Sequence, residues 1–486
     1  MAESSSPAAL TLALTSQPSV PGMDPHHQDD CPENGLGRGN GETNGPPAKR
    51  SRPTPPLSPI TAAEIAEEFS HHDLSVARIN NGSFGSCPGS VLSAQAVWQR
   101  LFLRQPDAFY FNHLQPGLLR SRAIVKDLIN AADIDEVSLV DNATTAAAIV
   151  LQHVSWAFSE GVFHKGDAVV MLHYAYGAVK KSIHAYVARA GGHVIEVPLP
   201  FPVSSNEEII REFRKALDLG KANGRRVRLA VIDHVTSMPS VVIPVKELTK
   251  ICRQEGVDQV FVDAAHAIGN VEVDVQDIDA DFYTSNLHKW FFCPPSVAFL
   301  HSKKCSSSAP CLHHPVVSQE YGKGLPLESA WIGTRDYSSQ LVVPSVIDFV
   351  NRFDGGILGI RTRNHDKVVE MGMMLAQAWG TFLGSPPEMC CSMIMVALPG
   401  SLGVSSEKDA LKLRSLLREE YRVEVPIHYH RPKDIEAGRQ NGHSGVTGYV
   451  RISYQVYNTV DDYYRLRDAV HKLVNDGFNC GMLPSK

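Results

Sequence analysis

The sequence lacks several features that would place it in particular classes of protein. No apolar run is long enough to cross a membrane, so we expect no transmembrane helix. The 9 cysteines are scattered, without a Cys-x-x-Cys pair, a pattern that favours a reducing compartment and predicts neither a disulfide framework nor a metal site. The formal net charge of −6 gives no general electrostatic reason to bind nucleic acid.

Residues 1–59 contain no aromatic side chain and few branched apolar ones. A segment this rich in Ser, Pro, Gly and Asn cannot bury enough apolar surface to fold, which predicts a disordered tail.

Residues 47–53 hold three basic side chains between prolines, either as a nuclear import signal or as an ordinary charged linker. Residues 1–21 resemble a transit peptide but have no arginine, so cytoplasm or nucleus is favoured over a plastid or mitochondrion.

From residue 137 onward, short apolar strands alternate with helical stretches. This alternation predicts an α/β domain whose mostly parallel sheet is covered by helices on both faces. The predicted strands are residues 137–140, 168–172, 193–197, 229–232, 260–262, 281–283 and 297–300. After Ser345, long helices and strands near residues 393–397 and 448–453 predict a smaller α+β domain. We therefore expect an N-terminal segment and large domain at residues 60–344 and a small domain at residues 345–486.

Polar residues follow several of these strands, at the sheet edge where ligands gather. Asp263 ends an apolar strand, and Lys289 stands in a polar turn after the next strand. A lysine there can form a Schiff base with a carbonyl cofactor, although a solvated loop lysine is the ordinary alternative. A buried carboxylate can keep a pyridinium nitrogen protonated. Together the two residues predict an enzyme that uses pyridoxal 5'-phosphate.

Other candidate residues have a functional and an ordinary interpretation. Asn142, Thr144 and Thr145 follow a strand and open a helix, where they could cradle a phosphate or simply cap the helix. Tyr174 could stack on a flat ring or pack at the edge of the core. Arg451 could bind a carboxylate through two parallel hydrogen bonds or lie on a surface strand.

Five motifs together resemble the class V aminotransferase family of fold-type I pyridoxal phosphate enzymes. They are Asn142-Ala143-Thr144-Thr145, residues 174–178, residues 263–266, residues 285–290 and Gly333-Thr334. Residues 176–178 and 286–290 are most similar to the isopenicillin N epimerase-like branch. From about residue 61 to the C-terminus, the chain most resembles the plant-type L-cysteine desulfhydrases of that branch.

The resemblance implies a role for each matching residue. Lys289 would bind the cofactor and move protons at the substrate, while Asp263 would hold the pyridinium nitrogen. His266 would face the phenolic oxygen, and Tyr174 would stack on the ring where relatives often carry a histidine. The remaining implied contacts are Thr144, Ser285 and His288 to the phosphate, Thr334 to the phosphate of a second subunit in a homodimer, and Arg451 and Asn81 to the substrate.

We therefore expect an L-cysteine desulfhydrase, which eliminates sulfide and ammonia from L-cysteine and leaves pyruvate. The same site could serve a cysteine desulfurase, an epimerase or an aminotransferase, and a non-catalytic nuclear interaction protein is the alternative of another class. A desulfurase needs an activated cysteine on a mobile loop. None is well placed in sequence among Cys293, Cys305, Cys311, Cys390, Cys391 and Cys480, which favours elimination.

Overall fold

The computed structural model describes residues 59–304, 312–430 and 446–482. The predicted tail lies, apart from Pro59, outside the described residues, as do Cys305 and Cys311. The described residues form one compact unit, so the predicted domain boundary near residue 345 stays a prediction. Among the described helices, none is long and apolar enough to span a membrane.

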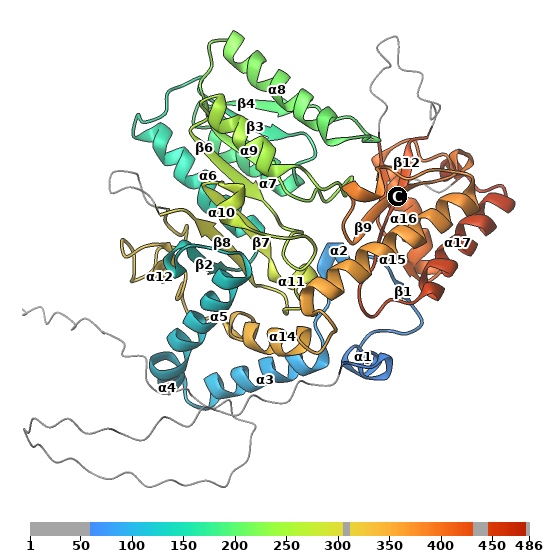
Figure 1. The fold of residues 1–486 in the computed structure, drawn as a ribbon, viewed down its shortest axis with the longest axis horizontal. Helices are drawn as coiled ribbons and strands as arrows, with labels where there is room; N and C mark the ends of the chain where they lie inside the picture. Colours follow the sequence, from blue (N-terminus) through green and yellow to red (C-terminus); the bar gives the residue numbers. More distant parts are fainter. Residues whose placement is uncertain (1–58, 305–311, 431–445, 483–486) are drawn as a thin grey trace, which may run out of the picture. The chain divides into compact units, whose positions relative to one another are not determined.

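A seven-stranded sheet lies at the centre of the larger part of this unit (Figure 1), with strand order β2-β8-β7-β6-β5-β3-β4. Strand β8 is antiparallel to β2 and β7, whereas the other neighbours pair in parallel. The mostly parallel sheet predicted from the sequence is therefore confirmed. The strands are β2 Val137–Val140, β3 Ala168–Leu172, β4 His193–Val197, β5 Val227–Asp233, β6 Gln259–Asp263, β7 Phe282–Asn286 and β8 Ala298–Ser302.

Helices cover both faces of this sheet because its apolar side chains alternate between the two faces. Val169, Met171 and Val231 pack with helices α6 (Ala143–Ser159) and α7 (Gly177–Ile183). The apolar side chains that point to the other face of the sheet pack in a second cluster. This cluster includes side chains from the other large helices of this part. Those helices are α3 Gly89–Arg104, α5 Gln115–Leu128, α8 Asn206–Ala222, α9 Val245–Gln254 and α14 Val343–Val350.

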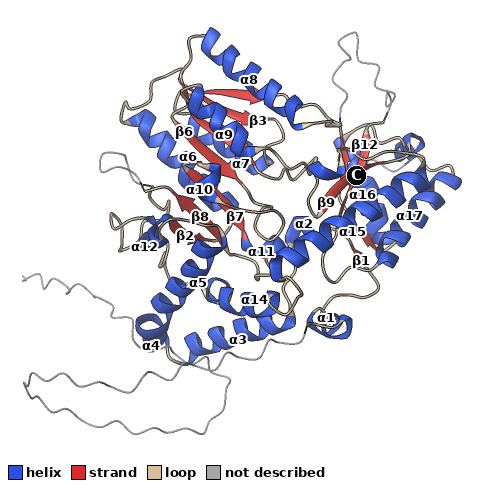
Figure 2. Cartoon of the chain, in the orientation of Figure 1, coloured by secondary structure: helices blue, strands red, loops and turns tan. Residues whose placement is uncertain are grey.

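A second, antiparallel sheet has the order β11-β12-β9, and helices lie beside it (Figure 2). Its strands are β9 Met393–Ala397, β11 Ile427–Tyr429 and β12 Gly448–Ser453, and the helices are α15 Gly356–Trp379, α16 Glu407–Glu420 and α17 Val460–Asn475. This is the smaller α+β part expected from the sequence. Strand β1 (Ala77–Arg78) pairs in parallel with β10 (Val423–Glu424), so the N-terminal segment also packs on this part.

The remaining helices are short. They are α1 Ala62–Glu68, α2 Asn81–Phe84, α4 Pro106–Phe109, α10 Val275–Ile278, α11 Leu287–Trp290, α12 Leu325–Glu328 and α13 Ser338–Leu341. Helix α1 begins with a capping box between Thr61 and Glu64. Strand β7 is longer than predicted because Ser285 and Asn286 continue its pairing with β8. The predicted polar turn is therefore the end of a strand followed by the helical turn α11.

Candidate active site

Lys289 lies on α11 at the carboxyl end of β7, and its amine faces His266. The Lys289 Nζ atom is 3.2 Å from His266 Nε2, and the Trp290 indole nitrogen donates to His266 Nδ1 over 3.3 Å. An indole N–H can only donate, so Nδ1 is the acceptor and the proton of a neutral His266 is on Nε2. That N–H points at the lysine nitrogen, which can accept it only as a neutral amine.

The surroundings of Lys289 favour the same neutral amine. Burial and, to a smaller extent, the positive charge of Arg451 lower the pKa of Lys289 to about 8, against the opposing effect of Asp263. Burial and the neighbouring Lys289 hold the pKa of His266 well below its ordinary value. A neutral lysine amine is the form that attacks a carbonyl carbon.

Asp263 ends β6 beside a second buried carboxyl group, that of Asp233 at the end of β5. The two residues are register partners on parallel strands, so their side chains lie on the same face of the sheet. Burial raises the pKa of both, and the charge of Asp263 raises that of Asp233 further. Asp263 accepts a hydrogen bond from the Ala265 amide over 3.1 Å. The charge is therefore favoured on Asp263 and the proton on Asp233.

Arg451 is on β12 and is 2% exposed. Its guanidinium group donates to Ser237 after β5 and to Asn80 and Ser83 in the N-terminal segment. Burial, with a contribution from Arg414, lowers the pKa of Arg451 to about 10. Arg451 forms no ion pair with a carboxylate of the described residues, and a buried charge without a counterion is costly. A carboxylate ligand would supply that counterion.

The N-terminal segment packs directly against the backbone of Lys289. The Asn81 side chain donates to the Lys289 carbonyl over 3.1 Å and accepts from the Tyr457 hydroxyl over 3.0 Å. Gly85 has φ +73°, and a Cβ atom there would lie 1.8 Å from the His288 carbonyl oxygen. Asn81 thus positions the lysine backbone, and its predicted contact with the substrate stays a prediction.

The start of α6 carries the predicted phosphate residues. Asn142 caps the helix by accepting from the Thr145 amide over 2.9 Å, and Asn286 accepts from the Ala143 amide over 2.9 Å. Thr144 is exposed at this helix start. A phosphate bound here would meet the positive end of the helix and the Thr144 hydroxyl.

Two further predicted phosphate residues are engaged with the backbone. The buried Ser285 hydroxyl donates to the Ala264 carbonyl and accepts from the Ile268 amide. His288 Nδ1 lies 3.2 Å from the Val297 carbonyl, and burial lowers the pKa of His288 to about 4. A neutral His288 that donates through Nδ1 keeps no N–H for a phosphate. The phosphate contacts of both residues stay predictions.

The last two predicted residues lie on separate loops. Tyr174 is half-buried, and its hydroxyl donates to the Pro200 carbonyl over 3.0 Å. Thr334 is exposed, and the adjacent Arg335 forms an ion pair with Asp141 of the same chain. That ion pair connects the Thr334 loop with the start of α6. A stacking role for Tyr174 and a contact from Thr334 across a dimer stay predictions.

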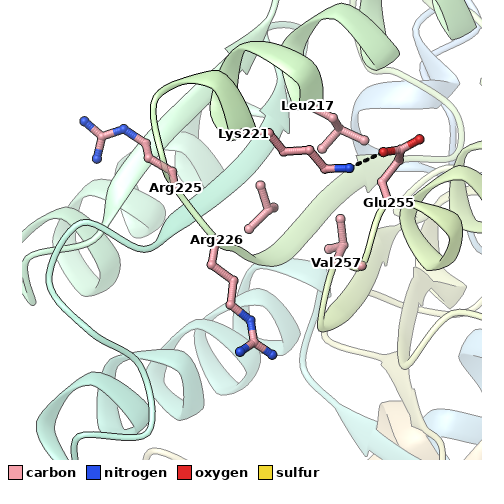
Figure 3. A pocket seen from close by; sticks show the side chains of 8 residues that line it. Leu217, Lys221, Arg225, Arg226, Glu255 and Val257 are labelled. Atoms are coloured by element: carbon pink, nitrogen blue, oxygen red, sulfur yellow. Dashed lines mark hydrogen bonds and ion pairs between the residues drawn. The ribbon is translucent and has the colours of Figure 1, made fainter.

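A cavity of about 320 Å³ lies at the opposite, amino-terminal edge of the sheet, beside Val227 at the start of β5. Figure 3 shows the Lys221 amine directed at Glu255, with which it forms an ion pair, while the guanidinium groups of Arg225 and Arg226 point away. The cavity therefore presents no unpaired cation to a ligand and lies apart from Lys289.

Comparisons with known proteins agree with this geometry. Residues 113–313 match the family model described as aminotransferase class-V. The L-cysteine desulfhydrase of Arabidopsis thaliana is 65% identical, over 88% of this chain and 94% of that protein. The chain belongs to the class V aminotransferase family. The isopenicillin N epimerase of Streptomyces clavuligerus is a more distant relative in sequence, 26% identical over 83% of this chain and 96% of its own.

Solved structures show the fold that this family membership implies. The cysteine desulfurase from Thermococcus onnurineus NA1 has a TM-score of 0.60 at 19% identity, over 82% of this chain and 95% of that chain. A complex of the cystine C-S lyase C-DES with cysteine persulfide has a TM-score of 0.60 at 17% identity, over 82% of this chain and 97% of its own. The predicted family and fold class are confirmed.

Membership of this family implies pyridoxal 5'-phosphate as the cofactor, and the residues present fit it. Lys289 would supply the amine for the aldehyde, and Asp263 would supply a buried carboxylate for the ring nitrogen. The exposed start of α6 at Thr144 would supply an anion site for the phosphate. Four residues around this site were not predicted from the sequence, namely Asp233, Asn80, Ser83 and Ser237. Of these, only Asp233 had a local signal, as an acidic residue directly after an apolar strand.

Proposed function

We propose that the chain is a pyridoxal phosphate-dependent L-cysteine desulfhydrase, which converts L-cysteine and water into hydrogen sulfide, ammonia and pyruvate. The observation that carries the proposal is the buried amine of Lys289, with its pKa lowered to about 8, beside Asp263, within a site that also holds Arg451 without a carboxylate partner among the described residues. These groups fit the cofactor aldehyde, the cofactor nitrogen and the carboxylate of an amino acid. Plant relatives named as L-cysteine desulfhydrases support the choice of substrate.

Each residue has a defined task in this reaction. The bound cofactor supplies an electron sink, which makes the proton on the substrate Cα acidic. Lys289 Nζ removes that proton, since its lowered pKa increases the fraction of neutral amine, the form that can accept a proton. Asp263 keeps the ring nitrogen protonated, and Arg451 holds the substrate carboxylate. The thiolate on Cβ is a good leaving group and departs as sulfide.

The described cysteines favour elimination over desulfuration. Cys293, Cys390, Cys391 and Cys480 are all buried, and burial raises the pKa of Cys390 to about 12 and that of Cys391 to about 11. A desulfurase needs an exposed thiol with a lowered pKa to accept the substrate sulfur. These four described residues do not supply one, which supports release of the sulfur as free sulfide.

The proposal includes a homodimer and an intracellular reducing compartment. Thr334 is exposed and is therefore available to the phosphate site of a second copy. Cytoplasm or nucleus is favoured, and a plastid is the alternative that one relative supports. That Arabidopsis thaliana relative, named "Probable L-cysteine desulfhydrase, chloroplastic", is 67% identical over 87% of this chain and 88% of its own.

Product analysis with L-cysteine tests the proposed reaction. The purified protein with bound cofactor should release sulfide, ammonia and pyruvate in equal amounts, and Lys289→Ala should release none. Alanine as the main product would favour desulfuration, and D-cysteine would favour epimerisation. Absence of turnover with all thiol amino acids would favour the non-catalytic alternative.

A further inference from the structure

The guanidinium group of Arg451 already has an acceptor for each of its terminal N–H groups. Nη1 donates to the Ser237 carbonyl over 2.8 Å and to the Ser237 hydroxyl over 3.2 Å. Nη2 donates to Asn80 Oδ1 over 3.0 Å and to the Ser83 hydroxyl over 2.8 Å. Each terminal nitrogen has two N–H groups, so these four bonds use them all. A carboxylate can therefore bind here only by replacing some of these acceptors.

The remaining donor, Nε, does not offer an alternative route. It is buried and has no hydrogen-bond partner among the described residues, so a carboxylate from the active site cannot reach it without displacing the surrounding side chains. A carboxylate that approaches the end of the guanidinium group instead takes one N–H from Nη1 and one from Nη2.

On each terminal nitrogen, one acceptor is easy to displace and one is not. The Ser237 carbonyl belongs to the main chain, and Asn80 is 7% exposed, with its Oδ1 also accepting from the Ser83 hydroxyl over 2.6 Å. Ser83 and Ser237 are half-buried, and rotation about one side-chain bond moves each hydroxyl. The two displaceable acceptors are therefore serine hydroxyls, one on each nitrogen.

We propose that the hydroxyls of Ser83 and Ser237 occupy, in the unliganded chain, the positions that the two oxygens of the substrate carboxylate take. When the carboxylate binds, each serine rotates and its O–H group donates to the carboxylate instead. The two serines thereby determine specificity for substrates that carry an α-carboxylate. The inference rests on the proposed function, because it concerns the same amino-acid site.

Removal of either hydroxyl weakens binding of the carboxylate. In the unliganded variant, water can replace the lost hydroxyl at Arg451, because both serine positions are half-exposed. In the liganded variant the carboxylate occupies that space, so its lost hydrogen bond is not replaced. A hydrogen bond to a charged group accounts for roughly tenfold in affinity or more.

The test is a titration of the protein with bound cofactor, followed by the absorbance of the cofactor. L-Alanine carries the carboxylate but no leaving group, and ethylamine lacks the carboxylate. Ser83→Ala and Ser237→Ala should each weaken L-alanine binding about tenfold and leave ethylamine binding unchanged. Ser83→Thr and Ser237→Thr, which keep a hydroxyl, should restore much of the affinity. Ser93→Ala is the matched control, since that hydroxyl bonds to the Gly89 carbonyl on α3.

Three outcomes would overturn the inference. Wild-type affinity for L-alanine in both alanine variants would show that the hydroxyls do not contact the carboxylate. Equal losses for L-alanine and ethylamine would show a purely structural role. A wild-type protein that responds to ethylamine but to no amino acid would overturn the proposed function together with the inference. Normal cysteine turnover in wild type alongside either of the first two outcomes would leave the proposed function standing.

Discussion

The neutral amine of Lys289 predicts how attachment of the cofactor depends on pH. Only the neutral amine reacts with an aldehyde, so in the cofactor-free protein the rate should rise with pH and level off above about 8. At pH 7 a lysine with a pKa of about 8 is neutral in about one molecule in ten. At the ordinary pKa of 10.5 that fraction would be about three in ten thousand, so the structure implies an attachment rate that is roughly 300 times higher.

Two substitutions test the physical origin of this shift. Arg451→Gln removes a positive charge that lowers the pKa of Lys289, so the midpoint of the rate profile should move to higher pH. Trp290→Phe removes the donor to His266 Nδ1, which frees the imidazole to place its proton there and accept from a charged lysine at Nε2. The midpoint should then also rise. Arg418→Gln, on the exposed part of α16, is the control for loss of a charge.

The assay is stopped-flow absorbance of cofactor binding to cofactor-free protein between pH 6 and pH 10.5, with thermal unfolding to confirm that each variant is folded. A wild-type rate that still rises steeply at pH 10 would refute the lowered pKa. An unchanged midpoint in Trp290→Phe would refute the assigned imidazole tautomer.

Three further predictions concern the carboxyl pair, the assembly and the cysteines. Asp233→Asn should keep most of the cysteine turnover and the cofactor spectrum because Asp233 holds a proton, whereas Asp263→Asn should lose most activity because a neutral amide no longer keeps the ring nitrogen protonated; equal losses in steady-state assays would contradict the assigned charge distribution. If Thr334 serves a second copy, mixing Lys289→Ala with Thr334→Ala chains should restore some turnover, and a monomeric active species in sedimentation would exclude the shared site. Serine replacements of Cys293, Cys390, Cys391 and Cys480 should retain pyruvate release, because these thiols are buried and not activated; loss of turnover in one of them with cofactor still bound would support desulfuration.

The large sheet could be predicted from the sequence because its determinants are local. Apolar runs such as residues 168–172 are buried on both faces, and that pattern is visible in a few residues of sequence. Lys289 and Asp263 were found for a related reason, since Asp263 ends such a strand and Lys289 lies in the short segment after the next one. Asp233 stands in the same relation to its own strand, but it was missed because only the pairing of β5 with β6 places it beside Asp263. Pairing between strands depends on residues far apart in the chain, and the sequence of one strand does not show it.

The surroundings of Arg451 could not be predicted in this way. Asn80 is 371 positions from Arg451 in the chain, and Ser237 is 214 positions away. Neither residue carries a local pattern that distinguishes it from an ordinary turn residue. Their role exists only after the N-terminal segment has packed between the two sheets, through the β1–β10 pairing and the contacts of Gly85 with His288.

The same N-terminal segment connects the two groups that would fix the substrate. Asn81 holds the backbone of Lys289, while Asn80 and Ser83 hold the guanidinium group of Arg451. In the proposed reaction the substrate would be fixed at its amino group by the cofactor and at its carboxylate by Arg451, so only its hydrogen and its side chain would remain to be placed at Cα. A hydrogen directed at Lys289 then leaves one position for the side chain, and this selects one hand of the amino acid. Because reaction rates fall steeply with misplacement of reacting groups, we expect changes in this segment to affect turnover even where they contact neither cofactor nor substrate.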